Sequence, residues 1–180
     1  MTKEGDSITD IKKRLAMAKT NAIKLSRVWQ SSDISLSLKK NLAKSLIWST
    51  ALYGCESWTL KNEAEKRIQS FEMWLWRRLL GVTWQEHRTN ISVRNDVGVP
   101  EKKGLLAEVK KRKLAKYGHW KRRGGSLVLA TVEGEPPGKN MRGRRRMEWS
   151  DNIRDWTEGG MRVAATAAWE RRRAPTVQRD

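Results

Sequence analysis

The sequence is poor in the residues that most often hold metals or form disulfides. Its 180 residues include one cysteine, Cys55, and two histidines, His87 and His119. A single cysteine cannot form an internal disulfide, so nothing here supports an oxidising, secreted destination. No CxxC or HxxxH spacing occurs, whereas a structural zinc site needs four ligands. We therefore expect no metal and no other cofactor.

Cys55 is also poorly placed to act as a nucleophile. A reactive thiol needs a nearby cation or a helix N-terminus to stabilise the thiolate. Cys55 instead follows a predicted helix C-terminus and precedes Glu56. Both neighbours disfavour the thiolate, so we interpret Cys55 as a small residue packed in a turn.

Several other features of enzymes and membrane proteins are missing. No apolar run approaches the roughly 18–20 residues that span a bilayer, and the polar N-terminus lacks the apolar centre of a signal peptide. We expect a soluble intracellular protein without a membrane partner. The sequence has no Walker-type loop, GxGxxG or serine nucleophile elbow.

One acidic cluster has the spacing of a catalytic pair. Asp151 and Asp155 lie four residues apart and could share a helix face, as in a two-metal nuclease. Together with Glu148 they fit better as acidic residues in the first turns of a helix, where they complement the helix dipole.

What the chain has in excess is positive charge and tryptophan. Its net charge is +18, and tryptophan occurs ten times against one phenylalanine and two tyrosines. Residues 101–146 hold 15 basic and 4 acidic residues, a net +11, whereas residues 1–60 hold +5, 61–100 hold +2 and 147–180 are neutral. A field concentrated in this way predicts a polyanionic partner, and RNA or DNA is the first candidate.

Apolar residues recur at helical spacing through most of the chain, which predicts an all-α fold. We expect a small helical bundle over 1–96, followed by a basic, partly irregular helical extension over 97–180. The predicted helices cover 11–29, 36–53, a segment from Asn62 to Gly81, a short helix capped by Thr89 or Asn90 and ending near Asp96, 104–123, 147–157 and 162–173. Residues 126–132 resemble a short β-strand, and 133–146 a flexible loop rich in Pro, Gly and Arg.

The spacing also predicts the buried face of each of the first helices. The first is expected to bury Ile11, Leu15, Ala18, Ala22, Leu25 and Trp29. The second is expected to bury Leu38, Leu42, Leu46, Ser49 and Leu52, and to end at Gly54. The third is expected to start with a capping box of Asn62 and Glu65, to bury Ala64, Ile68, Phe71, Leu75 and Leu79 with Trp74 and Trp76 flanking them, and to end at Gly81.

Basic residues interleaved with aromatics are the positive functional signal. Lysine and arginine neutralise phosphates and release counterions, which gives affinity without base reading. We predict phosphate contacts from Arg77, Arg78, Lys111, Arg112, Arg122, Arg123, Lys139, Arg142, Arg144, Arg145 and Arg146. Trp84, Trp120 and Trp149 could stack on bases if exposed, although Trp120 and Trp149 could equally be core residues. The run RGRRR also fits a nuclear-localisation signal.

Five sequence segments, taken together and in order, show a resemblance to a known family that none of them shows alone. They are DIKKRLAMAK, ISLSLKKNLAKSLIWSTALYGCESWTL, FEMWLWRRLLGVTWQEHRTN, KKRKLAKYGHWKRR and VEGEPPGKNMRGRRRMEWSDNIRDW. This series resembles the C-terminal part of the endonuclease–reverse transcriptase of non-LTR (LINE-type) retrotransposons. The resemblance implies a thumb-like region followed by a post-thumb region that contacts RNA or target DNA.

The resemblance also implies what this chain does not carry. The acidic palm motif that holds two metal ions for RNA-directed DNA polymerase activity is not in the sequence, and neither is the endonuclease domain. We therefore expect the chain alone to have no polymerase activity, and to bind template–primer through phosphates with low sequence specificity. Two alternatives stay open: a polymerase part active only with a palm and finger fragment supplied in trans, and a relic or fragment of the element without a role.

Overall fold

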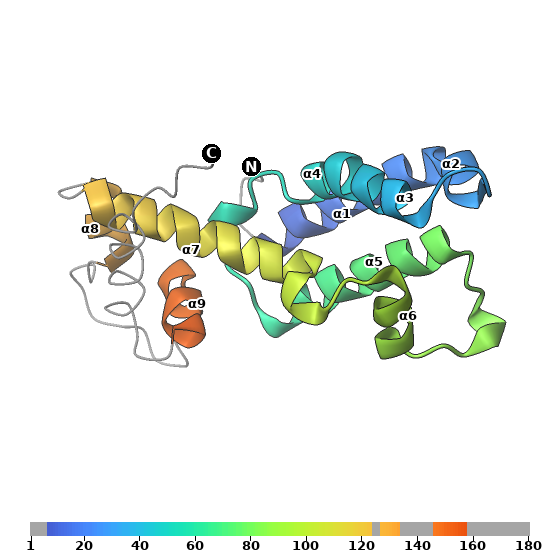
Figure 1. Cartoon of the computed structure of the whole chain (residues 1–180). Helices are drawn as coiled ribbons and strands as arrows, with labels where there is room; N and C mark the ends of the chain where they lie inside the picture. The colour runs from blue at the N-terminus through green and yellow to red at the C-terminus, as the bar shows by residue number, and fades with distance from the viewer. Residues whose placement is uncertain (1–6, 124–126, 134–145, 158–180) are drawn as a thin grey trace, which may run out of the picture. The chain divides into compact units, whose positions relative to one another are not determined.

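The computed structural model describes residues 7–123, 127–133 and 146–157, and all regular structure within these ranges is helical (Figure 1). The all-α prediction is therefore confirmed. In chain order the α-helices are α1 (Ser7–Lys24), α2 (Ser26–Gln30), α3 (Leu36–Leu42), α4 (Ser49–Ala51), α5 (Asn62–Leu80), α6 (Asn90–Val97), α7 (Leu105–Arg123), α8 (Leu127–Glu133) and α9 (Trp149–Trp156). A π-helix, η1 (Ala43–Trp48), joins α3 to α4, and the 3₁₀ turns are η2 (Cys55–Ser57), η3 (Trp84–Glu86) and η4 (Glu101–Lys103).

The chain forms two compact units, residues 1–110 and 111–180, and the division falls inside α7. In the first unit α1 packs against η1, α4 and α5, and α5 also contacts α2 and α6 (Figure 1). The functional division that we placed after residue 96 stays a prediction. The predicted helix 162–173 and most of the predicted loop 133–146 lie outside the described residues.

The helix α5 supplies the centre of the first unit. All five residues of its predicted stripe are buried, from Ala64 to Leu79. Trp76, expected at the edge of this stripe, is fully buried and its ring centroid lies 6.0 Å from that of Trp48. The helix ends at Gly81, whose φ of 71° is the left-handed conformation that glycine adopts readily.

The capping box predicted at Asn62 and Glu65 is wrong. Asn62 is already the first helical residue, and the extended residue before it, Lys61, makes no side-chain cap. The Lys61 carbonyl accepts the first helical bond instead, from the Glu65 N–H. A capping box does occur further on, between Thr83 and Glu86.

The second predicted buried face is correct at Leu52, which is buried, and wrong over most of its length. Leu38 and Leu46 are 50% and 48% exposed, while Ala43, Ile47 and Ala51 are buried. A π turn bonds residue i to i+5, one residue more than an α turn, so the inward-facing register shifts by one position. The prediction assumed an unbroken α period and therefore placed Leu46 where Ile47 lies, whereas Leu38 is exposed in α3, before the π-helix begins.

The first predicted helix is divided in two at Leu25, whose φ and ψ of −89° and 17° are not α-helical. The Ser26 hydroxyl donates to the Ile23 carbonyl at this break. Ile11, Ala18, Ala22 and Trp29 are buried as expected, and the Trp29 indole N–H donates to the Ala22 carbonyl at 2.7 Å.

The predicted β-like segment 126–132 is wrong as well, since α8 covers Leu127–Glu133. The helix is held to α7 at its last residue: Glu133 accepts a hydrogen bond from the Tyr117 hydroxyl at 2.5 Å and one from Lys121 Nζ at 2.7 Å. These tertiary contacts override the β propensity of the apolar run.

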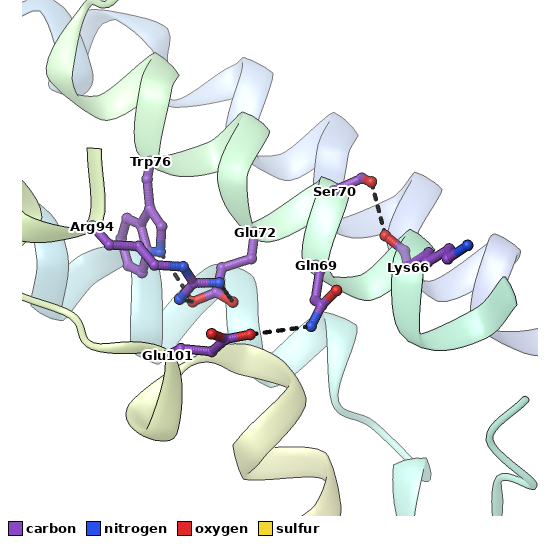
Figure 2. A network of polar contacts seen from close by, with 7 residues as sticks. All are labelled: Lys66, Gln69, Ser70, Glu72, Trp76, Arg94 and Glu101. Carbon is purple, nitrogen blue, oxygen red and sulfur yellow. Dashed lines mark hydrogen bonds and ion pairs between the residues drawn. The ribbon is translucent and has the colours of Figure 1, made fainter. Parts of the chain in front are cut away.

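A buried ion pair joins α5 to α6 (Figure 2). The Glu72 side chain is 1% exposed, and its carboxylate lies 3.3 Å from Arg94 Nη2. The Trp76 indole N–H donates to the same carboxylate at 3.1 Å. A Cβ added to Gly104 would lie 2.8 Å from Glu72 Oε2, so any larger residue there would require this bonded carboxylate to move.

Candidate nucleic-acid interface

A groove of about 540 Å³ lies between α1 and α5, and we call it the α1–α5 groove. Two cations from each helix line it together with one carboxylate and two aromatic rings: Lys12, Lys19, Lys66, Arg67, Glu63, Phe71 and Trp74. The two rings are 6.0 Å apart and inclined by 27°, which forms an apolar floor between the charged rims.

Most of the charge in this groove is uncompensated. Arg67 pairs with Glu63 at 2.9 Å, but Lys12, Lys19 and Lys66 form no ion pair within the described ranges. Lys19 Nζ lies 5.2 Å from the centroid of Trp74, within reach of a cation–π interaction. A groove with free ammonium groups and an aromatic floor is suited to the phosphates and sugars of a nucleic-acid backbone.

A second groove, of about 420 Å³, lies at the C-terminal end of α5, and we call it the Trp84 groove. Three tryptophans and two arginines are among its lining residues: Trp29, Trp74, Arg77, Arg78 and Trp84. Trp74 lines both grooves, and Arg78 Cζ lies 5.8 Å from its ring centroid. Both grooves are therefore built from the first unit alone.

Arg77 and Arg78, which the sequence predicted as phosphate contacts, both lie in the Trp84 groove. Arg77 Nη2 donates to the Arg88 carbonyl at 3.2 Å and to Asn90 Oδ1 at 2.7 Å. Arg78 Nη2 donates to the Ser26 hydroxyl at 2.8 Å. Neither arginine pairs with a carboxylate in the part of the chain that the structure describes. The described residues therefore supply no counter-charge to either guanidinium.

The predicted phosphate contacts of the second unit that the structure describes are exposed. Lys111, Arg112, Arg122 and Arg123 are exposed in α7, and Arg146 is exposed before α9. Other basic residues of the same runs are engaged: Lys110 pairs with Glu65 at 2.9 Å and Lys121 with Glu133 at 2.6 Å. The remaining predicted phosphate contacts lie outside the described residues: Lys139, Arg142, Arg144 and Arg145.

Lys113, in the middle of α7, is fully buried. Its Nζ donates to Asn152 Oδ1 at 2.7 Å and lies 4.5 Å from the ring centroid of Trp149 and 5.4 Å from that of Trp156. Burial disfavours the ammonium form and lowers the pKa of Lys113 to about 7. Lys113 therefore ties α7 to α9 and is not available to phosphates.

The exposures of the three candidate stacking residues differ. Trp84 is 79% exposed, whereas Trp120 and Trp149 are partly buried with their ring centroids 5.4 Å apart. Tyr117 also contacts Trp149, at 6.4 Å. Trp120 and Trp149 thus pack together, as the alternative interpretation proposed, and Trp84 is the open platform among the three.

Of the residues that could suggest catalysis, Glu148, Asp151 and Cys55 have structural roles, whereas Asp155 is exposed. Asp151 accepts from the Glu148 N–H at 2.7 Å in a capping box, and it lies 3.6 Å from Arg154. Cys55 is fully buried beneath the turn that contains it, as predicted. Among the described residues no three His, Cys, Asp or Glu side chains are grouped to hold a metal ion.

Sequence reasoning missed the lysines of the α1–α5 groove. The prediction from sequence relied on the density of charge along the chain, and these lysines lie in segments where basic residues are not concentrated. The signal was present in the spacing: Lys12 and Lys19 are seven residues apart on α1, and Lys66, Ser70 and Trp74 are four apart on α5. Either spacing places side chains along one helix face.

Comparison with known proteins gives one informative similarity. The chain is 33% identical over 120 residues to an uncharacterized transposon-derived protein of Caenorhabditis elegans. The match covers 65% of this chain and 43% of that relative, so the chain spans less than half of the length of the protein it matches. No family model and no solved structure matches the chain. No described helix has the length and apolar character needed to span a bilayer.

Proposed function

We propose that this chain is a transposon-derived nucleic-acid-binding module: the thumb and post-thumb part of a non-LTR retrotransposon reverse transcriptase, without a polymerase site of its own. The observation that carries the proposal is the α1–α5 groove, in which Lys12, Lys19 and Lys66 surround an aromatic floor without forming ion pairs to described residues. The similarity to a transposon-derived protein and the resemblance of the ordered sequence segments support the same origin.

The chemistry of the groove favours contact with the nucleic-acid backbone over base reading. Its rim consists of flexible lysines, which act as point charges toward phosphate. Its floor offers apolar surface to sugars. The exposed cations of α7, among them Lys111 and Arg112, extend the basic surface of the chain. Such a protein binds RNA, DNA or a hybrid duplex with low sequence specificity, and the RGRRR run fits a nuclear destination.

The salt dependence of binding tests this proposal. The affinity of the full chain for a labelled 20-base-pair RNA–DNA hybrid should fall linearly on a logarithmic scale with salt concentration. Lys12→Gln together with Lys66→Gln should make this slope shallower by about 1–2, because each lost phosphate contact removes about 0.9. Fluorescence anisotropy at four salt concentrations measures it.

Lys13→Gln is the matched control, since Lys13 is exposed on the same helix but does not line the groove. Its slope should equal that of the wild type. An affinity of the wild type that does not change with salt would contradict the proposed function. Equal slopes for the double variant and for Lys13→Gln would remove the α1–α5 groove from it.

A further inference from the structure

Trp84 is both exposed and held in place. Its side chain is 79% exposed, so the indole removes little apolar surface from water on folding. The loop that carries it is nevertheless fixed at several points. The Val82 N–H donates to the Arg77 carbonyl at 2.9 Å where α5 ends, and Glu86 Oε1 accepts from the Thr83 N–H at 2.7 Å in the capping box.

The far end of the same loop is tied back to α5 by Arg77. Its Nη2 donates to the Arg88 carbonyl and to Asn90 Oδ1, so the segment from Gly81 to Asn90 is closed at its base. His87 lies against Trp84 with ring centroids 6.3 Å apart and planes at 89°. An aromatic ring presented on a fixed loop loses little conformational entropy when a ligand binds to it, which is the property of a preorganised contact.

The groove beside Trp84 is positively charged. Arg77 donates to described residues from Nη2 alone, and the guanidinium has five N–H donors in all. Arg78 donates to the Ser26 hydroxyl, and its buried Nε has no acceptor among the described residues. An open indole beside two arginines without carboxylate partners matches a ligand that joins a flat apolar ring to an anion. A nucleotide has this composition.

We propose that the Trp84 groove binds an unpaired nucleotide of a single-stranded stretch of RNA or DNA, with the base stacked on Trp84 and the phosphate facing Arg77 and Arg78. This inference rests on the proposed function, because it assigns a substrate class to part of the same surface. A base inside a duplex has both faces covered by its neighbours, whereas an unpaired base offers an open face to an aromatic side chain. The α1–α5 groove contacts backbone in either form, so the Trp84 groove supplies the preference for single strands or frayed ends.

Trp84→Ala in the full chain tests this directly. The probes are a fluorescein-labelled 12-nucleotide single strand, as DNA and as RNA of the same sequence, and the blunt DNA duplex of that sequence. Stacking on one aromatic residue contributes enough affinity that the variant should bind both single strands about tenfold more weakly. Its affinity for the blunt duplex should stay within about twofold of the wild type. Trp84→Phe, which keeps an aromatic face, should recover most of the lost affinity.

Two further readouts separate stacking from a general loss of affinity. A single 2-aminopurine in the DNA strand should be quenched on binding to the wild type and not on binding to Trp84→Ala. Ile91→Ala is the matched control, since Ile91 is 73% exposed in α6 and does not line the groove, and it should bind every probe like the wild type. A loss confined to the DNA or the RNA strand identifies which nucleic acid the site takes.

The inference is overturned if Trp84→Ala binds single strand and duplex with equal loss, or with no loss. Either result would leave the proposed function intact, provided that the wild type still binds in a salt-dependent manner. If the wild type binds none of the probes, the proposed function itself fails. The two failures are therefore distinguishable within one set of titrations.

Discussion

Among the described residues, each of the two units buries one charged side chain, and the units stabilise it in different ways. Glu72 in the first unit meets the opposite charge of Arg94 and the indole N–H of Trp76. Lys113 in the second unit is held by the amide oxygen of Asn152 and the faces of Trp149 and Trp156. The first arrangement places a carboxylate against an opposite charge and a hydrogen-bond donor. The second surrounds an amine with groups that accept either protonation state, and burial brings its pKa to about 7.

The difference shows what each buried charge contributes to its unit. A buried pair fixes geometry, since either partner left alone is a costly uncompensated charge. An amine among aromatic rings gains from cation–π attraction when charged and from apolar packing when neutral. The first unit should therefore be sensitive to loss of a partner, whereas the second should be sensitive to pH.

The largest effect is expected from breaking the pair in the first unit. Glu72→Gln removes the counter-charge of Arg94, whose side chain is only 12% exposed. We expect the free energy of unfolding to fall by about 3 kcal/mol. Urea unfolding followed by circular dichroism measures it. Glu63→Gln, which removes an exposed pair with Arg67 on the same helix, should cost about 0.5 kcal/mol or less. Equal losses in the two variants would refute a special role for the buried pair.

A smaller effect is expected from crowding the same carboxylate. Gly104→Ala places a methyl group within 2.9 Å of both Glu72 oxygens, and Arg94 and Trp76 prevent the carboxylate from moving freely. We expect a loss of about 2 kcal/mol in the free energy of unfolding. In a Glu72→Ala background the methyl group has room, so the same substitution should cost much less there. Additive losses in this double-mutant cycle would show that the clash is not with Glu72.

The smallest change, counted per pH unit, is expected in the second unit. The folded pKa of Lys113, about 7, lies below its unfolded value, so the unfolded chain binds an extra proton between the two values. Stability should rise with pH from 7 to 9, by at most about 1.4 kcal/mol per pH unit. Lys113→Met should flatten this rise. The measurement is urea unfolding at pH 7, 8 and 9, and an unchanged slope in Lys113→Met would assign the pH dependence elsewhere.

Much of the structure of the first unit can be predicted from the sequence, because its central helix, α5, keeps the α-helical period throughout. The α5 stripe from Ala64 to Leu79 and the end at Gly81 are simple consequences of α-helical spacing and a left-handed glycine. The register of residues 36–53 could not be predicted in this way, since a π turn has no simple sequence signature. The segment 127–133 has β propensity, and its helical form depends on the bonds that Tyr117 and Lys121 make to Glu133.

The candidate interface was predictable only in part. Arg77 and Arg78 were found from helix-face geometry, and Trp84 from the chemistry of stacking. The lysines of the α1–α5 groove were not found because Lys12 and Lys66 come together only when α1 packs on α5. Charge density in sequence is a local quantity, whereas the charge of a groove sums contributions from helices that are distant in the chain.

The π turn in η1 has a consequence for how the fold tolerates change in length. A widened turn is how a helix absorbs one inserted residue while the core contacts on either side stay in place. Ala43 and Ile47 stay buried, and the extra residue of the widened turn is accommodated on the outer side of the helix, where Leu46 is exposed. A relative one residue shorter here would keep the same core with an ordinary α-helix. In an alignment, a single-residue gap between positions 43 and 48 would then mark a change of local winding and not a change of fold.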